Sequence, residues 1–204
     1  MNRPIAFLLL GLALGVSPVL NAADAPVAPV APVAPAASLP GQSLYHLQVT
    51  LTDQHGASVP WTSLRGRPQL VSMFYGNCHL MCPLIIESAK AVQKQLPADQ
   101  RTRLDVDMLT LDPVRDTPAA LAEIAQRHRA PGEWRFLRPA EGDVRALANL
   151  LDVRYRFRDD GSINHTSVLV LLDAEGRVRA RSEVQGVAAD PEMVAAIGAV
   201  LDGR

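Results

Sequence analysis

The sequence has little excess charge of either sign and no basic stripe. Its 204 residues include 20 basic and 21 acidic side chains, which gives a formal net charge of −1. A nucleic-acid-binding surface needs clustered basic side chains, so the composition argues against nucleic acid as a partner. Hydrophobic residues make up 48% of the chain, which is enough for one domain of ordinary size with its own core.

Cysteine is also scarce, because Cys78 and Cys82 are the only two in the chain. This count suits either a cytosolic enzyme or an exported redox protein and does not decide the compartment. A disulfide between them would close a very short loop and remove little chain entropy. A purely structural bridge is therefore the weaker interpretation of the pair.

The N-terminus has no apolar run of full membrane-spanning length. Arg3 precedes residues 5–20, a shorter run with the layout of a secretory signal. We expect residues 1–25 to be a signal peptide or a retained membrane anchor, and the lack of a cysteine near the cut argues against a lipoprotein. Residues 26–38 are predicted to be an Ala/Pro/Val-rich linker, in which regularly spaced prolines favour polyproline II.

Residues 39–204 are expected to form one α/β domain without internal repeats. Alternating or continuous apolar patterns predict strands, and apolar residues at helical spacing predict helices between them. The expected strands are 45–52, 69–75, 104–108, 134–137, 155–158, 166–172 and 177–182, and the expected helices are 83–96, 119–129, 143–151 and 191–201. This order, with a hairpin at each end, predicts a sandwich around a mainly parallel sheet.

Both thiols lie where a buried strand turns into a helix. The strand stops at Gly76, and the helical pattern begins at Pro83. The first N–H groups of a helix favour an anion, so a thiol there tends to have a lowered pKa. Its thiolate binds metal or attacks a disulfide. If the helix extends back through the turn, Cys78 and Cys82 lie one turn apart on one face.

Two more candidates are expected at the same sheet edge. Asp112 follows the second core strand and lies beside the thiols if the two strands are parallel. His165 precedes an apolar strand and reaches this edge if that strand is antiparallel. Two thiolates and an imidazole make a soft site suited to copper or zinc, with a coordination position left open. By itself, however, a histidine at a loop–strand junction is more often simply solvated.

Other polar or soft side chains are assigned weaker roles. His79 and Met81 lie in the cysteine turn, but neighbouring positions point in different directions, so we assign neither as a ligand. His128 is placed in the last turn of a helix, where a cation suits the helix dipole. Asp116 is expected to cap the helix that follows it.

Three separated motifs in the right order carry a resemblance to a known family. They are F-Y-G-N-C-H-L-M-C-P, L-D-P-V-R-D-T-P and N-H-T-S-V-L-V-L-L-D-A-E-G, and with the segments between them they resemble the Sco/SenC family over residues 39–201. The resemblance implies a thioredoxin-like three-layer sandwich with an N-terminal β-hairpin and a central mixed sheet. It implies that Cys78, Cys82 and His165 bind a copper ion and that Asp112 supports the site.

The resemblance also implies a function and partners. It indicates a periplasmic copper chaperone, not an enzyme, that delivers copper to the cytochrome c oxidase subunit carrying the CuA site. A periplasmic thiol reductase or another copper chaperone is the second expected partner, and residues 5–20 could tether the protein to the membrane. Gly76, Asn77 and His79 depart from the residues that many members have around the first cysteine, which bears on metal preference and partner choice.

The main alternative is a thiol–disulfide oxidoreductase that maintains the cysteines of an exported copper protein. An exported dithiol must cycle against an oxidising compartment. Thioredoxin-type reductases, however, use C-x-x-C and a proline opposite the thiols, whereas this chain has C-x-x-x-C and Asn164-His165. A peroxiredoxin-like peroxidase is disfavoured, because Tyr75 and His79 stand where those enzymes place a threonine.

Overall fold

The structure is a computed structural model that describes residues 38–78 and 81–203. The expected signal or anchor at 1–25, nearly all of the linker at 26–38, and His79 lie outside these residues, and the assignments made for them stay predictions. Within the described part of the chain, no helix is both long and apolar enough to cross a bilayer.

A five-stranded mixed sheet forms the centre of the domain, in the order β5-β4-β3-β8-β9. The first three of these strands are mutually parallel, and β8 is antiparallel to both of its neighbours. The strands are β3 (Gln69–Phe74), β4 (Asp105–Thr110), β5 (Arg135–Leu137), β8 (Val168–Leu172) and β9 (Val178–Glu183). The expected mixed sheet with a parallel centre is confirmed.

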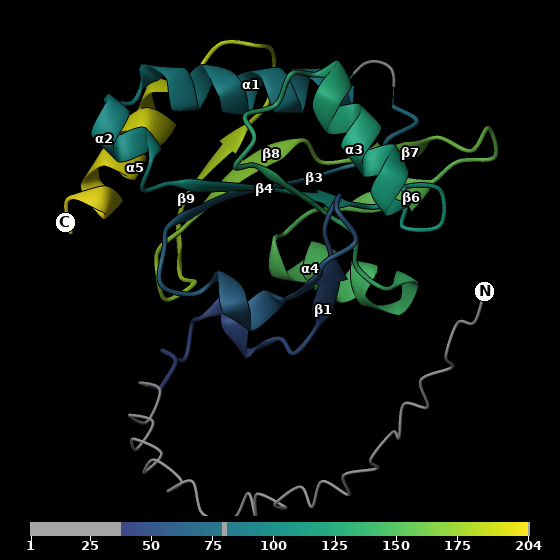
Figure 1. Cartoon of the computed structure of the whole chain (residues 1–204), viewed down its shortest axis with the longest axis horizontal. Helices are drawn as coiled ribbons and strands as arrows, with labels where there is room; N and C mark the ends of the chain where they lie inside the picture. Colours follow the sequence, from purple (N-terminus) through teal and green to yellow (C-terminus); the bar gives the residue numbers. More distant parts are fainter. Residues whose placement is uncertain (1–37, 79–80, 204) are drawn as a thin grey trace, which may run out of the picture. The chain divides into compact units, whose positions relative to one another are not determined.

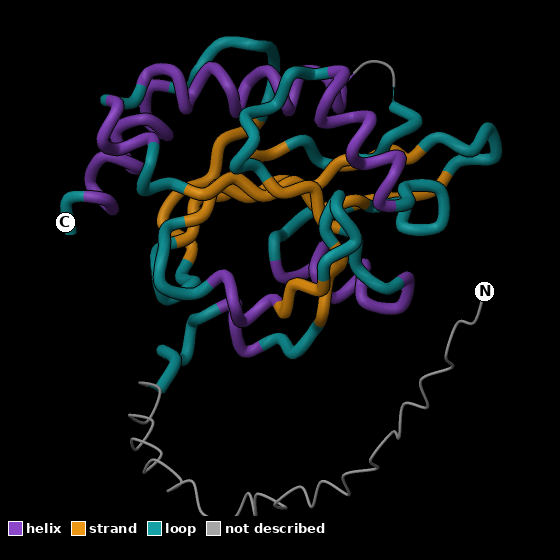
Figure 2. The backbone as a smooth tube through the Cα atoms, viewed as in Figure 1, coloured by secondary structure: helices purple, strands orange, loops and turns teal. Residues whose placement is uncertain are grey.

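Helices cover both faces of this sheet (Figures 1 and 2). In Figure 1, α1 and α5 lie above the sheet and α4 lies below it. The apolar residues of α1 recur at the predicted spacing and are buried against the sheet, and Asp190 caps α5 as predicted by accepting from Glu192 N–H at 2.8 Å. The helices are α1 (Met81–Gln95), α2 (Ala98–Arg101), α3 (Pro118–Arg127), α4 (Val144–Leu150) and α5 (Pro191–Leu201), and the 3-10 turn η3 (Glu141–Asp143) precedes α4.

The expected N-terminal hairpin is present but shorter than predicted. It pairs β1 (Thr50–Thr52) with β2 (Ser58–Pro60). Alternation from Tyr45 to Leu51 predicted one strand, yet its first part forms the 3-10 turn η1 (Leu44–His46). The ring of Tyr45 is buried edge-on against Trp61 of η2 (Trp61–Leu64), with centroids 5.6 Å apart. Tyr45 is therefore buried by packing against the ring of Trp61, and not by pairing in a strand.

A second small hairpin lies between α4 and β8. It pairs β6 (Tyr155–Phe157) with β7 (Ile163–His165) in antiparallel register. The sequence predicted the extended piece at 155–158 but placed His165 directly before the apolar strand. In the structure His165 instead ends β7, a separate strand that precedes β8.

The ends of three core strands meet at one edge of the sheet. Leu111, just after β4, donates its N–H to the carbonyl of Phe74 at the end of β3 over 2.7 Å. The Ser72 hydroxyl donates to the carbonyl of Val168 at the start of β8 over 2.5 Å. The antiparallel direction of β8 therefore brings its start to the carboxyl ends of β3 and β4, as the sequence predicted.

Candidate metal-binding site

The cysteine turn links β3 to α1. Its first cysteine closes a turn by donating its N–H to the carbonyl of Tyr75 at 3.3 Å. The helix begins at Met81, two residues earlier than the sequence predicted, so Cys82 lies in its first turn. The N–H of Cys82 donates to Sγ of Cys78 at 3.2 Å. The helix N-terminus therefore favours negative charge on Cys78, and Cys78 and Cys82 are not joined by a disulfide.

Cys82 has a different environment from its partner. Its side chain is buried, and Sγ accepts a hydrogen bond from the N–H of Tyr75 at 3.4 Å. The hydrogen bond with Cys78 and burial together raise the pKa of the Cys82 thiol well above its ordinary value. The expectation that a helix N-terminus lowers the pKa is therefore wrong for Cys82. The stabilising N–H serves Cys78, while Cys82 itself is desolvated.

His165 points one ring nitrogen towards this buried thiol. Its Nδ1 lies 3.0 Å from the carbonyl of Thr166, which can only accept, so Nδ1 carries the proton. The unprotonated Nε2 lies 3.8 Å from Sγ of Cys82. Burial lowers the pKa of His165 below its ordinary value, which keeps the imidazole neutral near pH 7. A neutral imidazole with a fixed tautomer is the form that binds a metal.

Tyr75, the residue after β3, packs between the thiol turn and the histidine hairpin. Its ring meets the ring of His165 edge-on, with centroids 5.8 Å apart and planes at 78°. Burial, with the nearby cysteines, raises the pKa of Tyr75, so its hydroxyl stays protonated. The sequence gave Tyr75 no part in the site. Its place at the end of the cysteine strand is the signal that could have identified it.

The three predicted ligands are brought together but are not arranged as a finished site. Cys82 and His165 face each other, whereas the sulfur of Cys78 is directed to the N–H of Cys82. Among residues 38–78 and 81–203, no group of three or more His, Cys, Asp or Glu side chains is placed to hold a metal ion. Binding by all three ligands would therefore need the Cys78 side chain to turn.

Asp112 lies at the same sheet edge, with its carboxylate engaged by an arginine. It pairs with Nε of Arg115, and Nη2 of Arg115 donates to the carbonyl of Gly161 at 2.8 Å. Gly161 lies in the turn between β6 and β7. These contacts connect Asp112 to the hairpin that carries His165. Its support of a metal site stays a prediction, and this connection is a route by which it could act.

Asp116 contacts the thiol turn itself. One oxygen of its buried carboxylate accepts from the N–H of Gly76 at 2.9 Å and also from the hydroxyl of Thr110. The cap of α3 is Thr117, which accepts from the N–H of Ala120, so the prediction that Asp116 caps this helix is wrong. Burial raises the pKa of Asp116. The sequence therefore predicted a contact of Asp116 within its own segment, whereas its carboxylate contacts the thiol turn.

A small cavity opens beside the two sulfurs. Its volume is about 150 Å³, and both cysteines contribute to its wall. Ile86, Ile124 and His128 also line this cavity. His128 caps the end of α3, and burial lowers its pKa. Met81 opens α1 and is half-buried. The cavity gives a ligand from outside a way to reach the sulfurs.

Comparison with protein-family models gives a match over nearly the whole described domain. The model of the SCO1/SenC family matches residues 39–202. A candidate copper-binding protein of Stutzerimonas stutzeri is 27% identical over 134 residues, which are 65% of this chain and 66% of that protein. The chain thus spans just under two thirds of the length of this relative.

Solved structures with the same fold extend the comparison. The copper-bound structure of Bradyrhizobium japonicum ScoI superposes with a TM-score of 0.64 at 22% identity, covering 76% of this chain and 98% of that chain. BsSco, described as a member of the Sco family of cytochrome c oxidase assembly proteins with a disulfide switch, superposes with a TM-score of 0.65 at 20% identity, covering 76% and 91%. At these identities the likeness shows the thioredoxin-like fold.

Proposed function

Because the chain belongs to the SCO1/SenC family, we propose that it is a periplasmic copper chaperone that holds copper through Cys78, Cys82 and His165. The observation that carries the proposal is the approach of Nε2 of His165 to Sγ of Cys82 at 3.8 Å. Thiolate and imidazole ligands suit copper, and three protein ligands leave a position open for exchange. The copper-bound relative from Bradyrhizobium japonicum supports the choice of metal.

The separation of these two atoms fits a shared metal ion. With the bond lengths that zinc takes, ~2.3 Å to sulfur and ~2.0 Å to nitrogen, an angle of about 120° at a shared ion would place the two ligand atoms roughly 3.7 Å apart. The observed 3.8 Å agrees with this value without movement of either residue. A hydrogen bond between the Cys82 thiol and Nε2 of His165 also fits this distance, so substitution of the ligands is the measurement that distinguishes the two cases.

The surrounding residues set the orientation and the exposure of each proposed ligand. The carbonyl of Thr166 fixes the tautomer of His165, and the ring of Tyr75 restricts its rotation. Cys82 is buried, so its surroundings would exclude water from one side of a bound metal. Cys78 is half-exposed and lies over the 150 Å³ cavity. Copper entering or leaving by ligand exchange would therefore exchange at Cys78 and the open position while Cys82 remains bound.

We propose that the CuA site of cytochrome c oxidase accepts the copper from this protein. The description of BsSco as a cytochrome c oxidase assembly protein supports this proposal for a protein of the same family. A periplasmic thiol reductase would keep both thiols reduced, as copper binding requires, or a second copper chaperone would reload the site with copper. The apolar run at 5–20 would export the protein or tether it to the membrane.

Copper(I) titration of the full chain against a chromogenic chelator tests the proposal. His165→Ala, Cys78→Ser and Cys82→Ser should each weaken binding at least as much as loss of an outer-shell partner does, about 10- to 100-fold. His55→Ala is the matched control, since His55 is exposed in a turn of the described domain. Unchanged affinity in His165→Ala would refute the three-ligand site.

One observation favours thiol–disulfide exchange as a second function. The N–H of Cys82 stabilises charge on the half-exposed Cys78, whereas Cys82 is buried and has a raised pKa. In exchange, the thiolate of Cys78 would attack a substrate disulfide, and Cys82 would then release the substrate by forming the intramolecular disulfide. Cys82→Ser should accumulate the mixed disulfide and Cys78→Ser should not. Equal trapping by both variants would contradict this assignment.

A further inference from the structure

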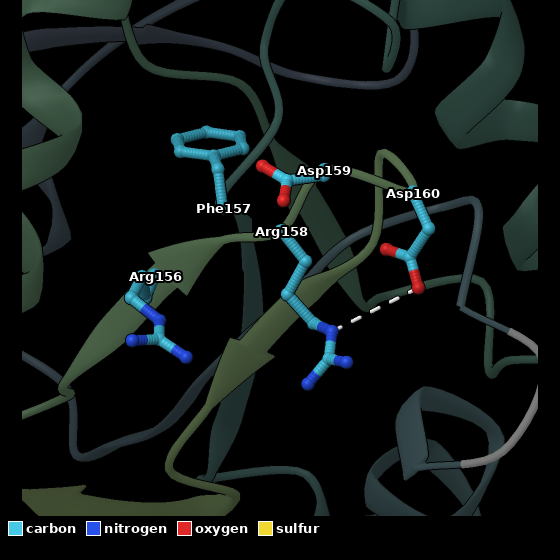
Figure 3. Close-up of a pocket in the computed structure, with 5 residues that line it drawn as sticks. All are labelled: Arg156, Phe157, Arg158, Asp159 and Asp160. Atoms are coloured by element: carbon cyan, nitrogen blue, oxygen red, sulfur yellow. Dashed lines mark ion pairs between the residues drawn. The ribbon is translucent and has the colours of Figure 1, made fainter.

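The hollows of the domain differ in the ligands that they offer a metal ion. The hollow at the tip of the β6–β7 hairpin measures about 550 Å³ and is lined by residues 156–160, whose charged side chains are arginines and aspartates (Figure 3). Guanidinium groups have no lone pair to give a metal, and carboxylates suit hard ions better than copper. The cavity of about 150 Å³ beside the two sulfurs has a further imidazole in its wall, that of His128.

The sequence gave His128 a different role, as a cation that suits the dipole of α3. Its backbone does end this helix, because its N–H donates to the carbonyls of Ile124 and Gln126. Burial, however, lowers the pKa of the imidazole below its ordinary value, so the ring is neutral near pH 7. A neutral imidazole adds no charge at the helix end, but it can bind a metal ion.

A carboxylate of α1 orients this ring. Nδ1 of His128 lies 3.8 Å from Oε1 of Glu87, and the same oxygen accepts from Nζ of Lys90 at 3.1 Å. Lys90 also donates to the carbonyl of His128 at 2.9 Å. A carboxylate beside Nδ1 favours the proton on that nitrogen and leaves the lone pair on Nε2. Metal-binding histidines commonly have a carboxylate partner of this kind on the nitrogen that does not bind the metal.

The cavity connects this imidazole with the thiols and with solvent. The side chain of His128 is 17% exposed, and Cys78 at the other side of the cavity is half-exposed. Ile86 and Ile124, which also line the cavity, give a metal no ligand, and Arg127 is exposed. Within the described wall, the soft ligands are therefore this imidazole and the two sulfurs.

We infer that His128 is a transfer ligand, which binds copper transiently as the ion passes between Cys78 and the donor or acceptor of copper. This inference rests on the proposed function, in which copper exchanges at Cys78 and at an open position. Nε2 of His128 would replace one ligand of the donor before Cys78 completes the site, and release would follow the reverse order. Only ligands are exchanged, so the oxidation state of the ion does not change. His128 is not a ligand of the final site.

Transfer rates and equilibrium affinity separate a transfer ligand from a ligand of the final site. Reduced full-length protein is mixed with the copper(I) complex of a chromogenic chelator, and copper uptake and its return to excess chelator are followed by stopped-flow absorbance. His128→Ala should slow both directions about tenfold, because loss of an intermediate raises the same barrier from either side. Its affinity should stay within about twofold of wild type, whereas His165→Ala should lose affinity.

Further variants distinguish ligation from packing. His128→Gln keeps a neutral side chain of similar size and should transfer copper as slowly as His128→Ala. Glu87→Gln removes the charge that holds the proton on Nδ1 and should slow transfer several-fold. His55→Ala is the matched control, because His55 is exposed in a turn, and it should leave both rates unchanged. A wild-type rate in His128→Gln would show that His128 acts through packing alone, and the inference would be wrong.

A second readout does not depend on loading of the three-ligand site. Silver(I), a soft closed-shell ion, is added to the Cys78→Ser/Cys82→Ser variant, and the histidine rings are observed by heteronuclear NMR. The Nε2 resonance of His128 should shift at a lower silver concentration than the ring resonances of the exposed His55. Equal responses of the two rings would contradict a metal ligand at His128.

The outcomes keep this inference separate from the proposed function. If the wild type binds copper and His128→Ala transfers it at the wild-type rate, the transfer role is wrong and the three-ligand site stands. If His128→Ala loses as much affinity as His165→Ala, His128 belongs to the final site, and the transfer role is also wrong. If the wild type binds no copper, both the proposed function and the transfer role are wrong.

Discussion

The carboxylate of Asp116 accepts a hydrogen bond from the backbone N–H of Gly76 at 2.9 Å. Gly76 lies two residues before Cys78, and Asp116 directly precedes the cap of α3. The same carboxylate oxygen accepts from the hydroxyl of Thr110 at the end of β4. One buried side chain therefore holds the thiol turn against the neighbouring strand and helix.

Asp116→Ala should lower both stability and copper affinity. It leaves the N–H of Gly76 and the hydroxyl of Thr110 without their acceptor, which costs about 1–3 kcal/mol for each buried group that stays unpaired. Asp116→Asn keeps one oxygen and should retain most of both properties. Urea unfolding and copper titration measure the two effects.

Asp173→Ala is the matched control for this prediction. Asp173 is also buried, and it accepts from the N–H groups of Glu175 and Arg177 in the β8–β9 turn. This turn lies at the end of β8 remote from the thiols. Asp173→Ala should destabilise the fold while leaving copper affinity unchanged. If both alanine variants weaken copper binding equally, Asp116 has no specific effect on the thiol turn.

Gly76→Ala should disturb the same contact from the opposite side. An added Cβ would overlap the carboxylate of Asp116 and lie 2.8 Å from Cδ1 of Ile124. Overpacking of this kind costs about 1–3 kcal/mol, and relief by movement of the turn would shift Cys78. Gly132→Ala meets no atom within 4 Å and should change stability by less than ~0.5 kcal/mol. Calorimetric unfolding of both variants checks the contrast.

Long-range convergence at the site followed from strand order and direction. The buried strands around 69–75 and 166–172 are continuous apolar runs, and their antiparallel pairing brings Cys82 and His165 to one edge. The contacts made by Asp116 did not follow, because a carboxylate before Thr117-Pro118 also fits a local helix cap. Two residues competed for that cap, and only tertiary packing decides which one turns inward.

Short elements were harder to predict for a related reason. Tyr45 alternates with polar neighbours as a strand residue would, but its partner is the ring of Trp61. Strand β7 is three residues long, and its polar loop and histidine gave no alternating pattern. In both places the conformation depends on contacts with residues distant in sequence, which a local pattern does not contain.

The stability of the domain should depend on pH through Asp107. This side chain is fully buried in β4, and Arg135 donates to it from Nε at 2.6 Å. Burial raises the pKa of Asp107 from 3.8 to about 6, although Arg135 opposes the shift. The folded state thus holds the proton more tightly than the unfolded state. Its contribution to stability is complete below about pH 3.8 and is lost as the pH rises through about 6.

Asp107→Asn removes this titration and should reveal its size. Between pH 4 and pH 7, the free energy of unfolding of the variant should rise relative to that of wild type by up to ~3 kcal/mol, because only the wild type loses stability as the pH rises. Urea unfolding of both proteins at several pH values in this range gives the difference. Parallel pH profiles would show that Asp107 has the same pKa in both states.

Arg115→Ala should loosen the hairpin that presents His165. Arg115 pairs with Asp112 and donates to the carbonyl of Gly161 at 2.8 Å, so its removal frees the hairpin turn from the edge of β4. We expect faster amide hydrogen exchange at 155–165 and copper affinity lowered several-fold, because a mobile His165 loses more freedom when it binds. Mass-spectrometric hydrogen exchange and copper titration measure the two effects.

Arg67→Ala provides a closely matched control for Arg115→Ala. Arg67 also pairs with a carboxylate, that of Asp105 at 2.8 Å, and donates to a backbone carbonyl, that of Thr102 at 2.6 Å. These contacts lie at the start of β3 and β4, the edge opposite the thiols. Arg67→Ala should therefore leave hydrogen exchange at 155–165 and copper affinity unchanged. If Arg115→Ala does the same, Asp112 does not support the site through this arginine, and the orientation of His165 depends on Thr166 and Tyr75 alone.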